Sequence, residues 1–180
     1  MTRPVLYLVV SGAPLASRIG DGVREARARG WQPFVIPTEA ASAWIDGQEL
    51  RELDVPIVAT HRQPNDEKQL PPADAVAVVP ATFNTLTAWA NGSANTFPLT
   101  ILCAALGARL PLVAVPFAKH DLAGHPGWLA SLAVLQYAGV IIVDPSTGKV
   151  GSAEPVASGT GGKVASAFQW AWVLEPLTSI

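Results

Sequence analysis

The chain alternates short, almost continuously apolar runs with longer stretches in which apolar residues recur at helical spacing. The runs are residues 5–10, 34–36, 55–59, 75–79, 112–115 and 140–143. Such runs predict strands with both faces buried, because a strand with one face in water alternates apolar and polar residues. Strands that alternate with helices predict a parallel sheet of about six strands, covered by helices on both faces. The pattern therefore predicts an α/β fold.

Helical spacing occupies the segments between these runs. We expect helices over residues 15–29, 39–45, 85–90, 96–106 and 125–137. Gly30 follows the first, at the position where a left-handed residue ends a helix at low cost. Residues 145–163 are rich in Gly, Ser and Pro and predict a long loop, either a lid or a connector, before an apolar helix over residues 164–174. We expect one domain, with residues 1–150 as its α/β part and residues 151–180 as its loop and C-terminal helix.

Composition excludes several classes of protein. The 12 Lys and Arg residues are scattered and balanced by 14 Asp and Glu residues, which argues against nucleic-acid binding. No apolar run approaches the roughly 20 residues that cross a membrane, and the N-terminal residues carry no cleavage signal. A single cysteine, Cys103, lies in an apolar run, so we expect a core residue and a cytoplasmic, reducing location. Charged residues make up only 14% of the chain, which favours a homo-oligomer that covers part of its own surface.

Polar and small residues follow two of the predicted strands. Ser11, Gly12 and Ala13 stand between the first strand and the helix after it. Ligands of an open parallel sheet bind beyond the carboxyl ends of the strands, and a turn of small residues before a helix exposes N–H groups that bind anions. Thr38 occupies the same position after the second strand. Its hydroxyl could either contact a ligand or cap the next helix.

The segment from Pro80 to Thr85 carries the most informative group of side chains. Thr82, Asn84 and Thr85 supply hydrogen-bond donors and acceptors, and Ala81 keeps the space beside them open. Hydroxyl and amide groups of this kind can bind the nitrogen and oxygen atoms at the edge of a planar heterocycle.

Residues 74–85 (DAVAVVPATFNT) and 90–95 (ANGSAN) resemble a flavoprotein family, the homo-oligomeric flavin-containing cysteine decarboxylases. This family includes phosphopantothenoylcysteine decarboxylase and the peptidyl-cysteine decarboxylases of lantibiotic synthesis. Residues 38–41 (TEAA) resemble its second flavin-contacting turn, and the helix and strand after His125 and Pro126 match its late elements. The resemblance runs in order over residues 5–148.

The resemblance implies a Rossmann-like (flavodoxin-like) three-layer sandwich that binds FMN and assembles as a trimer, with each flavin between subunits. It implies that the phosphate of FMN is bound near the first two strands and that the isoalloxazine ring lies beside the turn after the fourth. The phosphate residues are Ser11, Gly12 and Thr38, with Ala13 beside them, and the ring residues are Ala81, Thr82, Asn84 and Thr85.

Two positions depart from the family pattern. The decarboxylases carry Pro-x-Met-Asn-x-x-Met after the fifth strand, with the Asn on the substrate carboxylate, whereas residues 116–122 read PFAKHDL and place Lys119 at that position. A lysine binds a carboxylate as a point charge and does not replace an amide. The family also has a histidine shortly before the residue that matches Asp74, and His61 is the nearest histidine here. His61, Lys119 and His120 are therefore the candidate catalytic residues, and His125 is an alternative.

These features predict an FMN-binding flavoprotein that acts on a small thiol or carboxylate substrate, with a degenerate decarboxylase signature. One alternative is an enzyme like the flavin prenyltransferases, which modify FMN. Another is a trimeric flavin-binding or regulatory protein without catalysis. The residues predict no metal site.

Overall fold

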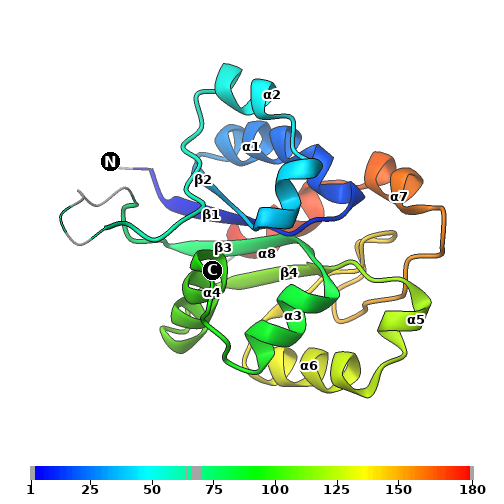
Figure 1. The fold of residues 1–180 in the computed structure, drawn as a ribbon. Coiled ribbons are helices and arrows are strands. Elements are labelled where there is room, and N and C mark those ends of the chain that lie inside the picture. Colours follow the sequence, from blue (N-terminus) through cyan, green and yellow to red (C-terminus); the bar gives the residue numbers. More distant parts are fainter. Residues whose placement is uncertain (1–2, 64, 66–69, 179–180) are drawn as a thin grey trace.

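A parallel sheet of five strands, in the order β2-β1-β3-β4-β5, forms the centre of the protein (Figure 1). The computed structural model describes residues 3–63, 65 and 70–178. The strands are β1 (Val5–Val10), β2 (Gln32–Pro37), β3 (Ala75–Ala81), β4 (Leu112–Pro116) and β5 (Ile141–Ile142). Neighbouring strands all pair in parallel. The chain order reverses between β1 and β3, which is where ligands bind in sheets of this order.

Two apolar layers cover the two faces of the sheet. In β1, Leu6 and Leu8 pack into one core cluster, whereas Tyr7 and Val9 pack into the other. The first cluster lies under α1 (Ile19–Ala28), α2 (Gly47–Glu52), α7 (Gly161–Ala167) and α8 (Ala171–Thr178). The second lies under α3 (Phe83–Ala90), α4 (Phe97–Gly107) and α6 (Pro126–Tyr137). The predicted three-layer sandwich with a parallel sheet is thus confirmed.

Short helices stand at the carboxyl edge of the sheet, directly after the strands. They are η1 (Pro14–Arg18) after β1, η2 (Glu39–Ala43) after β2 and α5 (His120–Ala123) after β4. The helix expected over residues 15–29 is therefore divided into a 3-10 turn that begins at Pro14 and an α-helix. The second of these, α1, is followed as predicted by Gly30 in a left-handed conformation, with a φ of 87°.

The strand expected over residues 55–59 does not join the sheet as a strand. Only Ile57 bridges to Val35 of β2. Pro56 accepts a hydrogen bond from the Val35 N–H through its carbonyl, at 2.9 Å, but has no N–H to donate. A proline cannot extend a hydrogen-bonded ladder, so the sheet has five strands where about six were expected.

The helix expected over residues 164–174 is two helices, α7 and α8, separated at Phe168 in an extended conformation. The Arg18 guanidinium donates to the carbonyls of Ala165 and Ser166, at 2.7 and 3.0 Å, and so binds the end of α7. The indole of Trp170 lies against Gly22 of α1 and donates to the Arg18 carbonyl at 3.1 Å. These contacts join the C-terminal segment to the first core cluster.

A buried carboxylate orders the first half of the predicted loop over residues 145–163. Asp144 is 1% exposed, and its Oδ1 accepts from the N–H groups of Ser146 and Thr147, both at 2.9 Å. Its Oδ2 accepts from the Glu154 N–H at 2.9 Å. Further on, Val156 pairs with Lys119 in a parallel bridge. The segment therefore returns to the edge of the sheet where β4 ends.

No helix in the described ranges is long and apolar enough to span a membrane. Cys103, expected in the core, is only half-buried on α4, where its thiol donates to the Ser93 carbonyl at 3.4 Å.

Candidate functional site

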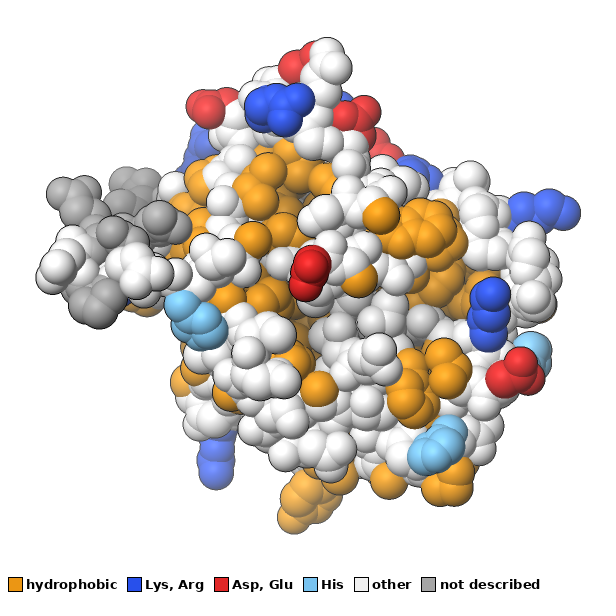
Figure 2. Space-filling view, viewed as in Figure 1, with side chains coloured by type: hydrophobic (Ala, Val, Ile, Leu, Met, Phe, Trp, Pro, Cys, Tyr) orange, Lys and Arg blue, Asp and Glu red, His pale blue; other side chains and the backbone are white. Residues whose placement is uncertain are grey.

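A cleft of about 1580 Å³ opens at the carboxyl ends of β1, β2, β3 and β4. Figure 2 shows this face, hollowed between the layer of α1 and α2 and the layer of α3 and α6, with apolar side chains along the hollow. The lining comes from the turns after all four strands and from the segment over residues 156–162. Because the sheet order reverses between β1 and β3, their turns diverge and leave this space open.

The turn after β1 packs directly on the turn after β2 at Gly12. A Cβ added at Gly12 would lie 2.6 Å from the carbonyl oxygen of Ala40 and 2.8 Å from the Ala40 Cβ. Only a residue without a side chain permits this approach. Gly12 and Ala13 line the cleft, and the Gly12 N–H has no hydrogen-bond acceptor within the described part of the chain.

Thr38 supplies a buried hydroxyl without a partner. It precedes η2, yet its side chain makes no capping hydrogen bond. Among the described residues, none bonds to its Oγ1, although that atom is buried. A buried hydroxyl that lacks a partner costs roughly 1–3 kcal/mol. Thr38 lines the cleft, so a ligand with an acceptor or donor atom there would satisfy the hydroxyl. Of the two roles expected for Thr38, capping is not observed, and contact with a ligand stays a prediction.

Ser11 lies beneath the cleft and not in its wall. It is 1% exposed, and its hydroxyl donates to Thr85 Oγ1 at 2.9 Å. This bond joins the turn after β1 to the turn after β3. Ser11 thus holds Thr85 in place. Contact with the phosphate of FMN stays a prediction, and Gly12 and Thr38 are the residues of this group that line the cleft.

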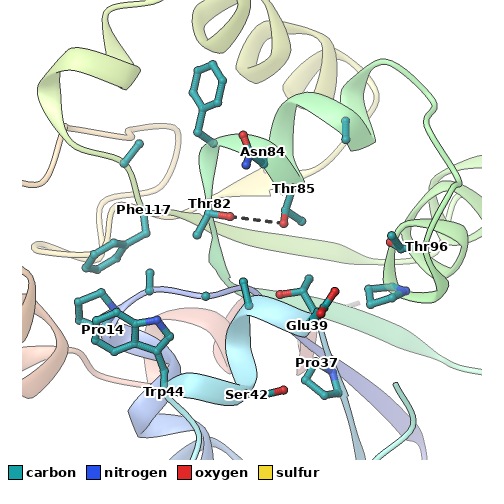
Figure 3. A pocket seen from close by; sticks show the side chains of 18 of the residues that line it. Pro14, Pro37, Glu39, Ser42, Trp44, Thr82, Asn84, Thr85, Thr96 and Phe117 are labelled. Carbon is teal, nitrogen blue, oxygen red and sulfur yellow. Dashed lines mark hydrogen bonds between the residues drawn. The ribbon is translucent and has the colours of Figure 1, made fainter. Parts of the chain in front are cut away.

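The turn after β3 presents the polar group predicted from the segment Pro80 to Thr85. Thr82, Asn84 and Thr85 line the cleft, whereas Ala81 is buried at the end of β3. Thr82 Oγ1 donates to Thr85 Oγ1 at 3.4 Å, as Figure 3 shows. The Asn84 side chain is exposed and makes no hydrogen bond to another described residue, so its amide is free for a ligand.

The candidate catalytic residues occupy different places. His61 lines the cleft, and its Nε2 lies 3.1 Å from Thr100 Oγ1. The Thr100 hydroxyl donates to carbonyls of the preceding turn, so it accepts from Nε2–H. The other ring nitrogen, Nδ1, bonds to no described residue. Lys119 also lines the cleft, with its side chain exposed, whereas His120 is exposed outside the lining.

His125, the alternative candidate for a catalytic residue, is the N-cap of α6. Its Nδ1 accepts from the Gly127 N–H at 2.9 Å and caps α6. Its ring meets Phe83 edge-on at 5.9 Å.

Several cleft residues were missed by the sequence analysis. Pro14, Trp44 and Phe117 gather at one end of the cleft, and Glu39 points into its middle (Figure 3). The spacing of residues 39–45 identified a short helix but could not say that its end faces the cleft, because that depends on the packing of η2 against Gly12.

Comparisons with known proteins show the family and the fold of this chain. The family model described as Flavoprotein matches residues 2–165. The coenzyme A biosynthesis bifunctional protein CoaBC of Mycobacterium tuberculosis is 29% identical over 163 residues. The match covers 84% of this chain but 36% of the curated relative's length.

Solved structures share the fold. A mutant PPC decarboxylase has a TM-score of 0.71 at 19% identity, covering 99% of this chain and 100% of its own. AnUbiX in complex with FMN and dimethylallyl pyrophosphate has a TM-score of 0.73 at 18% identity, covering 98% of this chain and 93% of its own.

Proposed function

Because the chain belongs to the flavoprotein family, we propose that it binds FMN in the cleft and acts on a small thiol or carboxylate substrate. The observation that carries the proposal is the unpartnered, buried hydroxyl of Thr38 beside the closely packed Gly12. Solved structures of the same fold include an FMN-binding protein, AtHal3, and the FMN complex of AnUbiX.

The phosphate of FMN would be held by Thr38 Oγ1 and the Gly12 N–H, with Ala13 beside them. Hydrogen bonds to a charged group contribute roughly 1.5–3 kcal/mol each. An anion here would also satisfy the hydroxyl that the fold leaves buried. Ser11 would act through its bond to Thr85, which sets the distance between the phosphate end and the ring end of the site.

The isoalloxazine ring would lie along Ala81, Thr82, Asn84 and Thr85. The Asn84 amide can donate to and accept from the polar edge of the ring, and the small Ala81 leaves space at the end of β3. Bound FMN would supply a two-electron acceptor, and the protein would position the substrate against it. His61, with Nδ1 free, could take a proton from the substrate at the α4 end of the cleft.

Lys119 in the position of the expected Asn changes the chemistry that we propose. A cation paired with a carboxylate stabilises the bound acid more than the transition state for its loss as carbon dioxide, because the charge leaves the carboxylate in that step. We therefore propose a flavin-dependent oxidation and treat decarboxylation of a cysteine-like substrate as one outcome of the test.

The first test is the absorption spectrum of the purified protein, followed by titration with FMN. Flavin bands, or saturable binding that Thr38→Val weakens, support the proposal, and a protein that takes up no FMN overturns it. Phosphopantothenoylcysteine and a peptide ending in cysteine are then added without oxygen while flavin bleaching is followed. Bleaching with release of carbon dioxide would show decarboxylation, and no bleaching with either compound would exclude these thiols as substrates.

A second candidate function is prenyl transfer to the flavin. It is favoured by the similarity to AnUbiX in complex with FMN and dimethylallyl pyrophosphate, which has the higher of the two TM-scores given above. Incubation with FMN and dimethylallyl phosphate, followed by mass spectrometry of the flavin, separates the two. A flavin heavier by one prenyl group supports transfer, and unchanged FMN excludes it.

We also propose that the protein is a homotrimer in the cytoplasm. On α6, Tyr137 is 95% exposed and Leu129 is 58% exposed, although the helix is apolar on most of its surface. A helix that is apolar all round is normally buried. Size-exclusion chromatography with light scattering tests the assembly, and a monomer at micromolar concentration would refute it.

A further inference from the structure

The chain just before His61 makes few bonds to the rest of the protein. The last backbone hydrogen bond before His61 joins the Val58 N–H to the Val35 carbonyl, at 3.0 Å. Ala59 and Thr60, which lie between, make no hydrogen bond to another described residue. The backbone here does not by itself fix the direction in which the His61 ring points.

Two side chains of α4 hold the His61 ring. Thr100 Oγ1 lies 3.1 Å from Nε2, and the Phe97 ring meets the imidazole edge-on, with the ring centres 5.2 Å apart. Phe97 and Thr100 are three residues apart, so they lie on the same face of the helix. Thr96, the N-cap of α4, lies at the end of the cleft opposite Pro14 (Figure 3). The first turns of α4 therefore fix where the ring stands at this end.

The Thr100 hydroxyl can only accept a hydrogen bond from the ring. Its single hydrogen is directed to the carbonyls of Ala94 and Thr96, both at 3.0 Å, and a carbonyl has no hydrogen to give back. Donation to the carbonyl four residues earlier is a common arrangement of threonine in helices. If the hydroxyl donated to the ring instead, its oxygen would face two carbonyl oxygens with no hydrogen between them. The His61 hydrogen is therefore on Nε2.

The same bond suits both charge states of His61. In the neutral ring, Nε2–H donates to Thr100 and the lone pair is on Nδ1, which bonds to no described residue. When Nδ1 takes a proton, both nitrogens become donors, and Nε2–H still donates to the same oxygen. The ring therefore keeps its place while it takes a proton and while it returns one.

We propose that Thr100 is a positioning residue that holds His61 in the tautomer with Nδ1 as the proton acceptor. The inference rests on the proposed function, in which His61 takes a proton from the substrate. In that step the proton of a thiol passes to Nδ1, the electron pair stays on the sulfur, and the hydrogen on Nε2 does not move. The bond that one ring nitrogen makes decides which nitrogen is left to act as the base. Thr100 does this from outside the cleft, since it is not among the lining residues.

The first test needs neither FMN nor substrate. Long-range 1H–15N NMR correlation of protein labelled with 15N-histidine shows which ring nitrogen carries hydrogen, at about pH 8.5, where an ordinary imidazole is neutral. We expect the ratio of the Nε2–H form to the Nδ1–H form to be about two- to tenfold higher for His61 than for the exposed His120, from one net hydrogen bond. His125 provides a reference for a ring fixed as Nε2–H, because its Nδ1 accepts from the Gly127 N–H.

Variants of Thr100 separate its hydroxyl from its shape. Thr100→Val keeps the shape and should bring the His61 ratio to that of His120, whereas Thr100→Ser should keep the wild-type ratio. Thr87→Val is the matched control. Thr87 also donates to the carbonyl four residues earlier, that of Phe83 at 2.8 Å, but it lies on α3 and outside the cleft lining. The His61 ratio should not change in the control.

The second test is anaerobic bleaching of bound FMN by phosphopantothenoylcysteine. Thr100→Val should lower the rate at saturating substrate roughly tenfold, the loss of one neutral hydrogen bond, with KM within twofold, because Thr100 contacts the base and not the substrate. Thr100→Ser should restore most of the rate.

Equal ratios for His61 and His120 in the wild-type protein, or an unchanged His61 ratio in Thr100→Val, would overturn the proposal. So would bleaching at the wild-type rate in Thr100→Val. A wild-type protein that takes up no FMN would overturn the proposed function, while the NMR ratios would still decide whether Thr100 holds the tautomer of His61.

Discussion

The substitution Gly12→Ala tests the packing on which the proposed phosphate site depends. The added Cβ would lie 2.6 Å from the Ala40 carbonyl oxygen, 2.7 Å from its carbon and 2.8 Å from its Cβ. These atoms belong to the backbone and to the root of a side chain, so no rotation relieves the contact. The turn after β1 and η2 must therefore move apart, because Cβ atoms in folded proteins essentially never come within 3.0 Å of such atoms.

The expected effect has two parts. An extra methyl group in a packed site costs about 1–3 kcal/mol of unfolding free energy, which corresponds to a fall in Tm of roughly 2–12 °C for a chain of this size. Movement of η2 also carries Thr38 away from the Gly12 N–H. If one hydrogen bond to the phosphate is lost, at roughly 1.5–3 kcal/mol, the Kd for FMN rises about 10- to 150-fold.

Thermal unfolding and FMN fluorescence titration measure the two parts. Gly107→Ala is the control, because Gly107 ends α4 on the surface with nothing within 4 Å of an added Cβ. Alanine is favoured over glycine in a helix by about 0.5–1 kcal/mol, so the control should be as stable as the wild type or more so and bind FMN equally. A Gly12→Ala protein with wild-type Tm and with FMN affinity within twofold would refute the reasoning.

Three further predictions follow from other contacts. Thr85→Val removes the acceptor of the buried Ser11 hydroxyl, so urea unfolding should show a loss of about 1–3 kcal/mol, which Thr85→Ser should not show. Gly22→Ala places a Cβ 2.5 Å from the Trp170 ring, and we expect about 1–3 kcal/mol of destabilisation with altered tryptophan emission; an unchanged spectrum would contradict it. Burial raises the pKa of the Cys103 thiol above its ordinary 9.0, so the unfolded chain loses the thiol proton at a lower pH than the folded chain does. The stability that this thiol contributes is fully present below pH 9.0, the unfolded pKa, and is lost as the pH rises through the raised pKa of the folded chain. Cys103→Ser should therefore flatten the decline in unfolding free energy at alkaline pH.

Parts of the site followed from local chemistry and could be predicted. Gly12 and Thr38 stand directly after buried strands, and the carboxyl ends of parallel strands meet at one edge of a sheet. Pro80 to Thr85 follows the same rule. Trp44 and Phe117 could not be assigned this way, because aromatic residues near strand ends are more often core residues, and Phe117 is itself mostly buried.

The two misassigned elements have different causes. The apolar pattern of residues 55–59 resembles a strand, but Pro56 cannot donate to a ladder. The pattern of residues 164–174 resembles one helix, but Arg18 binds the carbonyls at the end of α7 and Trp170 packs on Gly22. Pro56 can be read from the sequence itself, whereas the break between α7 and α8 depends on partners far away in the chain.

The sequence by itself determined the layers of this protein and the edge at which its cleft lies. Continuous apolar strands require cover on both faces, and small or polar residues after β1, β2 and β3 mark the edge where free N–H groups and hydroxyls collect. Only the tertiary structure decided which of those groups remain free. Ser11 bonds to Thr85 and His125 caps α6. Within the described part of the chain, the Thr38 hydroxyl has no hydrogen-bond partner and the Lys119 ammonium has no ion-pair partner. Pairing of this kind depends on distances between distant segments, which residue order alone does not contain.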